Sequence, residues 1–111
     1  MATSPKGKIA LVPFPFSDLS KAKLPPAVVL SSLEKGDLIL CRITSNPYSD
    51  PLALKITDLN FVEGSLKRIS YVRPGKLFTS SDKLIENYAG TLNAKKIDEI
   101  IESVIRLLRQ Q

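Results

Sequence analysis

Short stretches rich in Ile, Val and Leu, each closed by proline, glycine or polar turn formers, divide most of this 111-residue sequence. The stretches that fit β-strands are residues 8–12, 27–30, 37–45, 52–56 and 67–72. No segment between them has the pattern of a helix, so the strands cannot be joined by the crossovers that parallel sheets need. The sequence therefore predicts a mainly β fold with an antiparallel, barrel-like sheet.

The end of the chain is predicted to be helical. A short helix is expected from an N-cap at Ser80 or Ser81 through Tyr88, and a longer one from an N-cap at Asn93 to about Leu108. Five aliphatic residues of the longer helix fall on one stripe: Ile97, Ile100, Ile101, Val104 and Leu108. We expect this C-terminal helix to pack that stripe against the barrel.

Length and charge limit the class of protein. We treat residues 1–111 as a single domain, because a chain of this size buries enough surface for one core. The net charge of +5 and pI near 9.5 favour an anionic partner, such as a nucleic acid, an acidic protein tail or an anionic lipid surface. No apolar run reaches the ~18 residues that span a bilayer, and the first residues lack the pattern of a signal peptide, so we expect a cytoplasmic protein with no membrane contact.

The chain contains no histidine and one cysteine, Cys41. A single cysteine cannot form an internal disulfide, which agrees with a reducing compartment. Without imidazole, the usual nucleophile–histidine pairs and His/Cys zinc sites cannot be assembled. We therefore expect no metal and no cofactor, and any catalysis must use Arg, Lys, Thr, Ser, Asp, Glu or Tyr.

The alternation of side chains along residues 37–45 separates two faces. The face expected to be core carries Ile39, Cys41 and Ile43. The opposite face carries Leu40, Arg42 and Thr44. A cation and a hydroxyl are thus predicted side by side on one strand.

Four segments follow one another along the sequence: GKIALVPFPFSDLSKAKLPPAVVLSS, the CRITS segment at residues 41–45, SYVRPGKLF at residues 70–78 and AGTL at residues 89–92. In this order they resemble the MazF/PemK family of toxin endoribonucleases. The resemblance implies an SH3-like (MazF/PemK/CcdB-like) barrel, a homodimer, and metal-independent cleavage of single-stranded RNA. It also implies a cognate antitoxin whose acidic or apolar tail occupies the RNA groove.

The resemblance also implies catalytic positions. Thr44 and Ser45 stand where the family places its hydroxyls, but Pro25 stands where the family has an arginine. Attack of a ribose 2′-hydroxyl on the adjacent phosphate builds negative charge that a cation must stabilise. Two cations are candidates, Arg42 and Lys23. We prefer Arg42, because guanidinium grips phosphate in bidentate fashion and a loop lysine must first be ordered.

Six further residues are candidates for binding the RNA strand: Phe14, Phe16, Asp18, Lys21, Arg73 and Lys76. The phenylalanines would stack on unpaired bases or else pack in the core or a dimer interface. The basic residues would follow the RNA backbone or only be solvated. The aspartate would position its loop or serve as a turn residue.

Two alternatives to a ribonuclease toxin follow from the same sequence. A member without the family arginine could have lost catalysis and bind RNA or an antitoxin only. A gyrase-directed toxin of the related CcdB type would share the barrel, but the chain has no tryptophan and ends in Leu-Leu-Arg-Gln-Gln, which resembles that group less.

Overall fold

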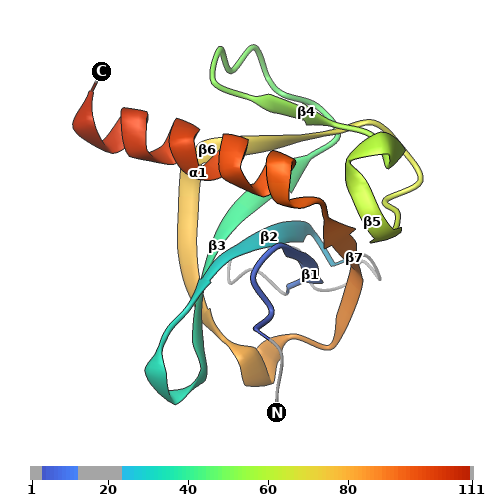
Figure 1. Cartoon of the computed structure of the whole chain (residues 1–111), viewed down its shortest axis with the longest axis vertical. Helices are drawn as coiled ribbons and strands as arrows, with labels where there is room; N and C mark the ends of the chain where they lie inside the picture. Colours follow the sequence, from blue (N-terminus) through green and yellow to red (C-terminus); the bar gives the residue numbers. More distant parts are fainter. Residues whose placement is uncertain (1–3, 13–23, 111) are drawn as a thin grey trace.

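The computed structural model describes residues 4–12 and 24–110 (Figure 1). The elements in this part are β1 (Lys8–Leu11), β2 (Pro26–Ser32), β3 (Asp37–Thr44), β4 (Leu54–Ile56), β5 (Phe61–Gly64), β6 (Ser70–Ser81), β7 (Asn87–Leu92) and α1 (Ala94–Arg109). The strands form one antiparallel sheet in the order β4-β6-β3-β2-β1-β7-β5, which curls into a half-barrel. The predicted mainly β fold with a C-terminal helix is confirmed.

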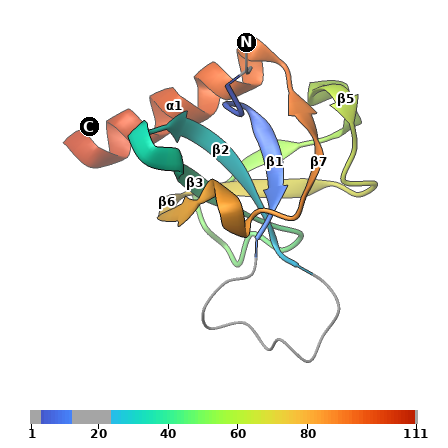
Figure 2. The same cartoon turned by 90° about the horizontal axis from the view of Figure 1, so that it is seen from below.

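The larger core lies between the sheet and α1, which runs along one side of the curled strands (Figures 1 and 2). Ile100 and Val104 of α1 pack into a cluster with strand residues: Ile9, Val28, Leu30, Cys41, Ile43, Ile56, Val72 and Leu92. Most of these are aliphatic, and burying each contributes roughly 1.5–3 kcal/mol. The helix is therefore held by its apolar stripe.

A second, smaller core covers the opposite face of the three central strands. Its buried members are Ala10, Val12, Ala27, Val29, Leu38 and Leu40, with Phe78 and Ile85 packed against them. The expectation that only one face of residues 37–45 is core was wrong, because Leu40 is fully buried on the same side as Arg42. Ile39 is only partly buried, next to a shift in the β2–β3 register. Cys41 and Ile43 are buried as predicted.

The region before α1 differs most from the prediction. The expected helix up to Tyr88 is a single 3₁₀ turn, Asp82–Leu84, and β7 follows it. Strand pairing decides this region, because β7 bonds to β1 on one side and to β5 on the other. The strand predicted at residues 67–72 begins only at Ser70 and continues to Ser81, and β5 was not predicted at all.

The start of α1 is as predicted. The side chain of Asn93 accepts a hydrogen bond from the Lys96 N–H at 2.8 Å, which caps the first turn. Leu108 is 70% exposed, contrary to its assignment to the packed stripe, because the last turn of α1 extends past β6 (Figure 1). Within the described residues, no helix is long and apolar enough to cross a membrane.

Candidate nucleic-acid interface

The face of the sheet that points away from α1 carries the predicted strand residues of the site. Cys41 and Ile43 belong to the core under α1, so Arg42 and Thr44 project from the other side of β3. The register pairs Thr44 with Tyr71 of β6, and Tyr71 in turn with Lys55 of β4. Directly opposite residues share a face, so these three side chains form one row across three strands. Neighbouring strands lie ~4.8 Å apart, which puts Lys55 about 10 Å from Thr44.

A large bulge in β6 brings two further cations, Arg73 and Lys76, to this face. Ile43 pairs with Val72 and Cys41 with Leu77, so the residues from Arg73 to Lys76 stand opposite Arg42 alone. Bulges of this kind redirect side chains next to functional sites. The Cys41 thiol fixes the bulge by donating a hydrogen bond to the Arg73 carbonyl at 3.0 Å.

The side chain of Arg73 is held in a defined position. Its Nε donates to Oδ2 of Asp50 at 3.0 Å, and the two side chains are 20% and 15% exposed. Its guanidinium lies 5.7 Å from the centre of the Tyr48 ring. The pKa of Asp50 is lowered by the hydrogen bond from the Leu52 N–H, by the bond from Arg73 and by the nearby charges of Arg73 and Lys76. Asp50 is therefore an anion at neutral pH and keeps Arg73 in place.

The Thr44 hydroxyl begins the loop that follows β3. Its Oγ1 donates to the Asn46 carbonyl at 3.0 Å and accepts from the Asn46 N–H at 3.1 Å. Thr44 is partly buried, whereas Ser45 and Arg42 are exposed. To contact a phosphate, the Thr44 hydroxyl would exchange its bond to the Asn46 carbonyl for one to a phosphoryl oxygen.

The structure brings together only part of the predicted site. Arg42, Thr44, Arg73 and Lys76 lie on β3 and on the facing bulge of β6. The predictions for Phe14, Phe16, Asp18, Lys21 and Lys23 fall outside the described residues. Pro25 directly precedes β2, and its carbonyl accepts a hydrogen bond from the Val12 N–H at 3.0 Å.

Three residues were not predicted: Lys55 and Tyr71, which lie on this face, and Tyr48, which lies beside Arg73. The strand alternation alone puts Lys55 on the other face of β4 from Leu54 and Ile56. Only the register shows that Lys55 lines up with Thr44. For Tyr48, the proline-flanked loop sequence gave no sign of its contact with Arg73.

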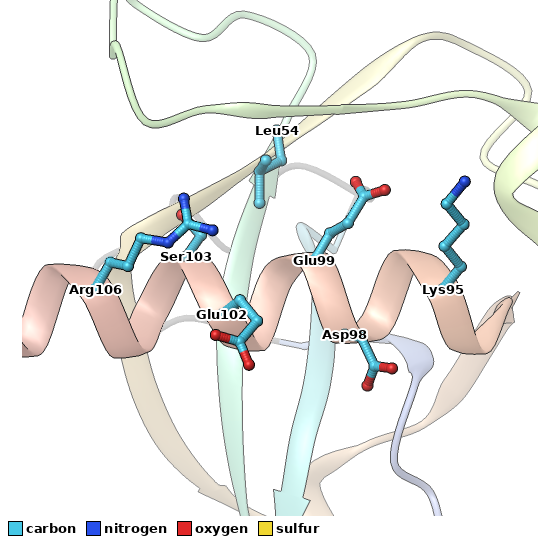
Figure 3. Close-up of a pocket in the computed structure, with 7 residues that line it drawn as sticks. All are labelled: Leu54, Lys95, Asp98, Glu99, Glu102, Ser103 and Arg106. Carbon is cyan, nitrogen blue, oxygen red and sulfur yellow. The ribbon is translucent and has the colours of Figure 1, made fainter.

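The hollow between β4 and α1 is a different kind of surface. It is a groove of about 550 Å³, and Leu54 points into it from β4 while Glu99 and Ser103 rise toward it from α1 (Figure 3). Asp98 and Glu102 also line it. Lys95 and Arg106 line it too, so three carboxylates stand beside two cations, and the groove has no excess of positive charge that would attract RNA. Within residues 4–12 and 24–110, these acidic residues included, no three His, Cys, Asp or Glu residues gather as a metal-binding group.

The fold and this face define a small, curled β-sheet protein whose exposed cations and tyrosine match the composition of single-strand nucleic-acid grooves. The family is shown by sequence. The model for the "PemK-like, MazF-like toxin of type II toxin-antitoxin system" family matches residues 5–108, and the chain belongs to this family. No curated protein sequence matches the chain.

Solved structures support the fold over the whole chain. An "Endoribonuclease in complex with its cognate antitoxin from Mycobacterial species" aligns with a TM-score of 0.75 at 12% identity and covers 98% of both chains. The MazE-MazF (Form-II) crystal structure from Deinococcus radiodurans aligns at 0.70 with 17% identity and 97% of both chains. The Mycobacterium tuberculosis toxin MazF-mt6 aligns at 0.69 with 14% identity, covering 92% of this chain and 96% of its own. These alignments confirm the predicted MazF-like barrel.

Proposed function

We propose that this toxin is a metal-independent endoribonuclease that cleaves single-stranded RNA through attack of a ribose 2′-hydroxyl. The observation that carries the proposal is the position of Arg42, which is exposed and stands on the same face of β3 as Thr44. Residues two positions apart on a strand are separated by about 6.6 Å. One phosphate group could therefore contact both Arg42 and Thr44. Family membership supports the reaction class.

In the proposed reaction the 2′-oxygen bonds to the adjacent phosphorus while the bond from phosphorus to the 5′-oxygen breaks. The 2′-hydroxyl loses its proton and the departing 5′-oxygen gains one, which leaves a cyclic phosphate and a new 5′-hydroxyl. Arg42 neutralises the negative charge that builds on the phosphoryl oxygens, with Lys23 as the second candidate. Thr44 and Ser45 orient the phosphate, and the cations Lys55, Arg73 and Lys76 hold the flanking backbone.

The test is cleavage of an unstructured RNA by purified protein in excess EDTA. The RNA should be cut, and an all-deoxy strand of the same sequence should survive because it lacks the 2′-nucleophile. Thr44→Ala should reduce cutting, and Arg42→Ala should slow it by ~10²- to 10³-fold, as expected for the loss of one well-placed donor. Equal cutting of the RNA and its deoxy analogue would overturn the proposed mechanism.

A second candidate function is binding of RNA or an antitoxin without cleavage. It is favoured by Pro25, which occupies the position of the family arginine. Under this alternative the wild-type protein binds RNA and leaves it whole, and Pro25→Arg gains cleavage. Cutting by the wild-type protein would rule it out.

The partners proposed for this chain are single-stranded RNA, a cognate antitoxin and a second copy of the chain, in the cytoplasm. Two of the aligned structures are described as complexes with an antitoxin or with MazE, which supports the antitoxin. The net charge of +5 suits an acidic antitoxin tail laid over the same basic face. A small acidic-tailed protein encoded next to this chain should block RNA cleavage when added at equal concentration, and light scattering should give the mass of a dimer.

A further inference from the structure

The loop between β3 and β4 carries a large aromatic side chain in solvent. Tyr48 is 66% exposed, although an exposed aromatic ring has hydrophobic surface to bury. It lies beside Arg73 and only four positions after Thr44. We propose that Tyr48 is a stacking platform for an unpaired base of the bound RNA, next to a phosphate held by Arg73. This inference rests on the proposed function, in which a single strand lies on this face.

The backbone around Tyr48 is fixed before any ligand binds. Three backbone N–H groups bond to a side chain two residues earlier: Asn46 to Thr44 (3.1 Å), Tyr48 to Asn46 (2.9 Å) and Leu52 to Asp50 (2.9 Å). Prolines at 47 and 51 further restrict the chain. Tyr48 and Ser49 have φ of +53° and +61°, a left-handed conformation that non-glycine residues adopt only when the surroundings hold them there. A ring presented from such a loop loses little freedom when a base stacks on it.

The contacts of Tyr48 leave room for a base. The Arg73 guanidinium lies over the ring, 5.7 Å from its centre, and covers part of it. The exposed remainder of the ring can receive a base. The ion pair with Asp50 uses Nε of Arg73, so the terminal N–H groups of the guanidinium remain able to donate to a phosphate. An aromatic ring with a cation beside it offers stacking to any base and charge to the backbone, as in other single-strand grooves.

The position along the strand links the ring to the cleavage site. Thr44 bonds to Asn46, and Asn46 bonds to Tyr48, so consecutive turns connect the proposed catalytic hydroxyl to the ring. A base stacked on Tyr48 would therefore flank the phosphate at Thr44, and this stacking would help to select which phosphate is cut.

Tyr88 provides a matched control for Tyr48. It is also exposed, at 41%, and also has a cation near its ring, with Lys8 Nζ at 5.2 Å from the centre. It lies on β7, which is separated from β3 by β2 and β1 in the sheet. Removing either ring takes away one exposed tyrosine and one cation contact. The register puts Tyr88 on the same face as Arg42 but three strands away, at ~14 Å, whereas Tyr48 lies in the loop that starts at Thr44.

The experiment measures binding with a probe that cannot be cut, a fluorescein-labelled pool of random-sequence RNA with 2′-fluoro riboses. Stacking of one base contributes ~1–3 kcal/mol, so Tyr48→Ala should raise Kd by about 5-fold or more. Tyr48→Phe keeps the ring and Tyr88→Ala leaves the loop intact, so both should stay within about twofold of the wild type. An unchanged Kd for Tyr48→Ala would overturn the inference.

A second readout does not depend on how well Tyr48→Ala folds. The chain has no tryptophan and three tyrosines, so replacing Tyr71 and Tyr88 by Phe leaves Tyr48 as the only source of tyrosine emission. The RNA pool should quench this emission, and emission that persists at saturation would contradict stacking. A wild-type protein that cuts RNA while Tyr48→Ala binds normally refutes the inference alone. A wild-type protein that neither binds the pool nor cuts RNA refutes the proposed function and this inference together.

Discussion

The buried thiol of Cys41 should make the stability of the protein fall in alkaline solution. Cys41 is fully buried in the core under α1, and its thiol donates to the carbonyl of Arg73. Burial raises its pKa from the ordinary value of 9.0 to about 12. The folded state therefore keeps the proton above pH 9, whereas the unfolded chain releases it. Because the unfolded state then binds fewer protons, the free energy of unfolding decreases as pH rises from about 9 toward 12.

The size of the effect follows from the two pKa values. With 9.0 for the unfolded thiol and about 12 for the folded one, the loss is about 0.4 kcal/mol at pH 9 and about 1.4 kcal/mol at pH 10. The value at pH 10 hardly depends on the folded pKa provided that it stays above about 11. The effect also concerns the candidate site, since the protonated thiol anchors the β6 bulge that carries Arg73.

The assay compares the wild type with Cys41→Ser and Cys41→Ala by urea unfolding in a reducing buffer between pH 7 and pH 10. All other ionisable groups are common to the three proteins, so their contributions cancel in the differences. The stability advantage of the wild type over each variant should be constant up to about pH 8 and about 1.4 kcal/mol smaller at pH 10. A difference that stays flat to pH 10 would mean that the thiol ionises equally in both states, and the burial argument would be wrong.

Three further predictions concern the scaffold. Gly90→Ala should lower the free energy of unfolding in urea by ~1–3 kcal/mol, because its Cβ would lie 2.5 Å from the Glu63 carbonyl oxygen. Gly75→Ala is the control: its Cβ would meet nothing closer than 3.6 Å, an ordinary contact, so this change should be nearly neutral. Asn93→Ala should lower stability by ~1 kcal/mol through loss of the α1 cap, and an unchanged helix content and midpoint would contradict this. Because the pKa of Asp50 is lowered in the folded state, the stabilisation by its carboxylate is present above pH ~4 and is lost as the pH falls further. The difference in free energy of unfolding between the wild type and Asp50→Asn should therefore shrink in acid. A difference that stays constant from pH 6 to pH 2 would refute the ion-pair argument.

The sequence predicted the elements whose signals are local. The cap and apolar stripe of α1 and the alternation along β3 are encoded in adjacent residues. The structure contains the Asn93 cap, the stripe apart from Leu108, and the predicted core positions Cys41 and Ile43 of β3. The segment up to Tyr88 was predicted to be helical because Ser80 or Ser81 can cap a turn. Ser81 does so, but strand pairing with β1 and β5 makes the residues from Asn87 onward a strand. Leu40 shows the same limit, since a second core on the far face depends on Phe78 and Ile85 from distant parts of the chain.

The residues of the candidate site likewise fall into those that local sequence predicts and those that only the strand register brings together. Arg42 and Thr44 were predicted together because they are two positions apart on one strand. Lys55 and Tyr71 join them only through the register of β4, β6 and β3, which no local pattern specifies. The bulge that puts Arg73 and Lys76 opposite Arg42 depends in part on a hydrogen bond from a buried cysteine, a contact that joins residues 32 positions apart.

Under the proposed function, the register offers a way to test whether a cation at position 42 can replace one at position 25. Ala27 of β2 pairs with Arg42 of β3, so extending this antiparallel register by two residues places Pro25 opposite Thr44. A side chain at position 25 and one at position 42 would then be neighbours of Thr44 on the same face, one across the strands and one along β3. If the reaction requires a cation beside Thr44 and not one particular backbone position, the two sites should be interchangeable.

A charge-relocation experiment tests this directly. Arg42→Ala should slow RNA cleavage by ~10²- to 10³-fold, and adding Pro25→Arg to that variant should restore most of the lost rate. Pro25→Ala in the same background is the control, because it removes the proline without adding charge and should restore nothing. Since Pro25 precedes β2 and its carbonyl, not its missing N–H, makes the bond to Val12, the substitution keeps the backbone contact. Rescue by Pro25→Ala as well as by Pro25→Arg would show that backbone freedom, not charge, limits the reaction, and would remove Arg42 from the mechanism.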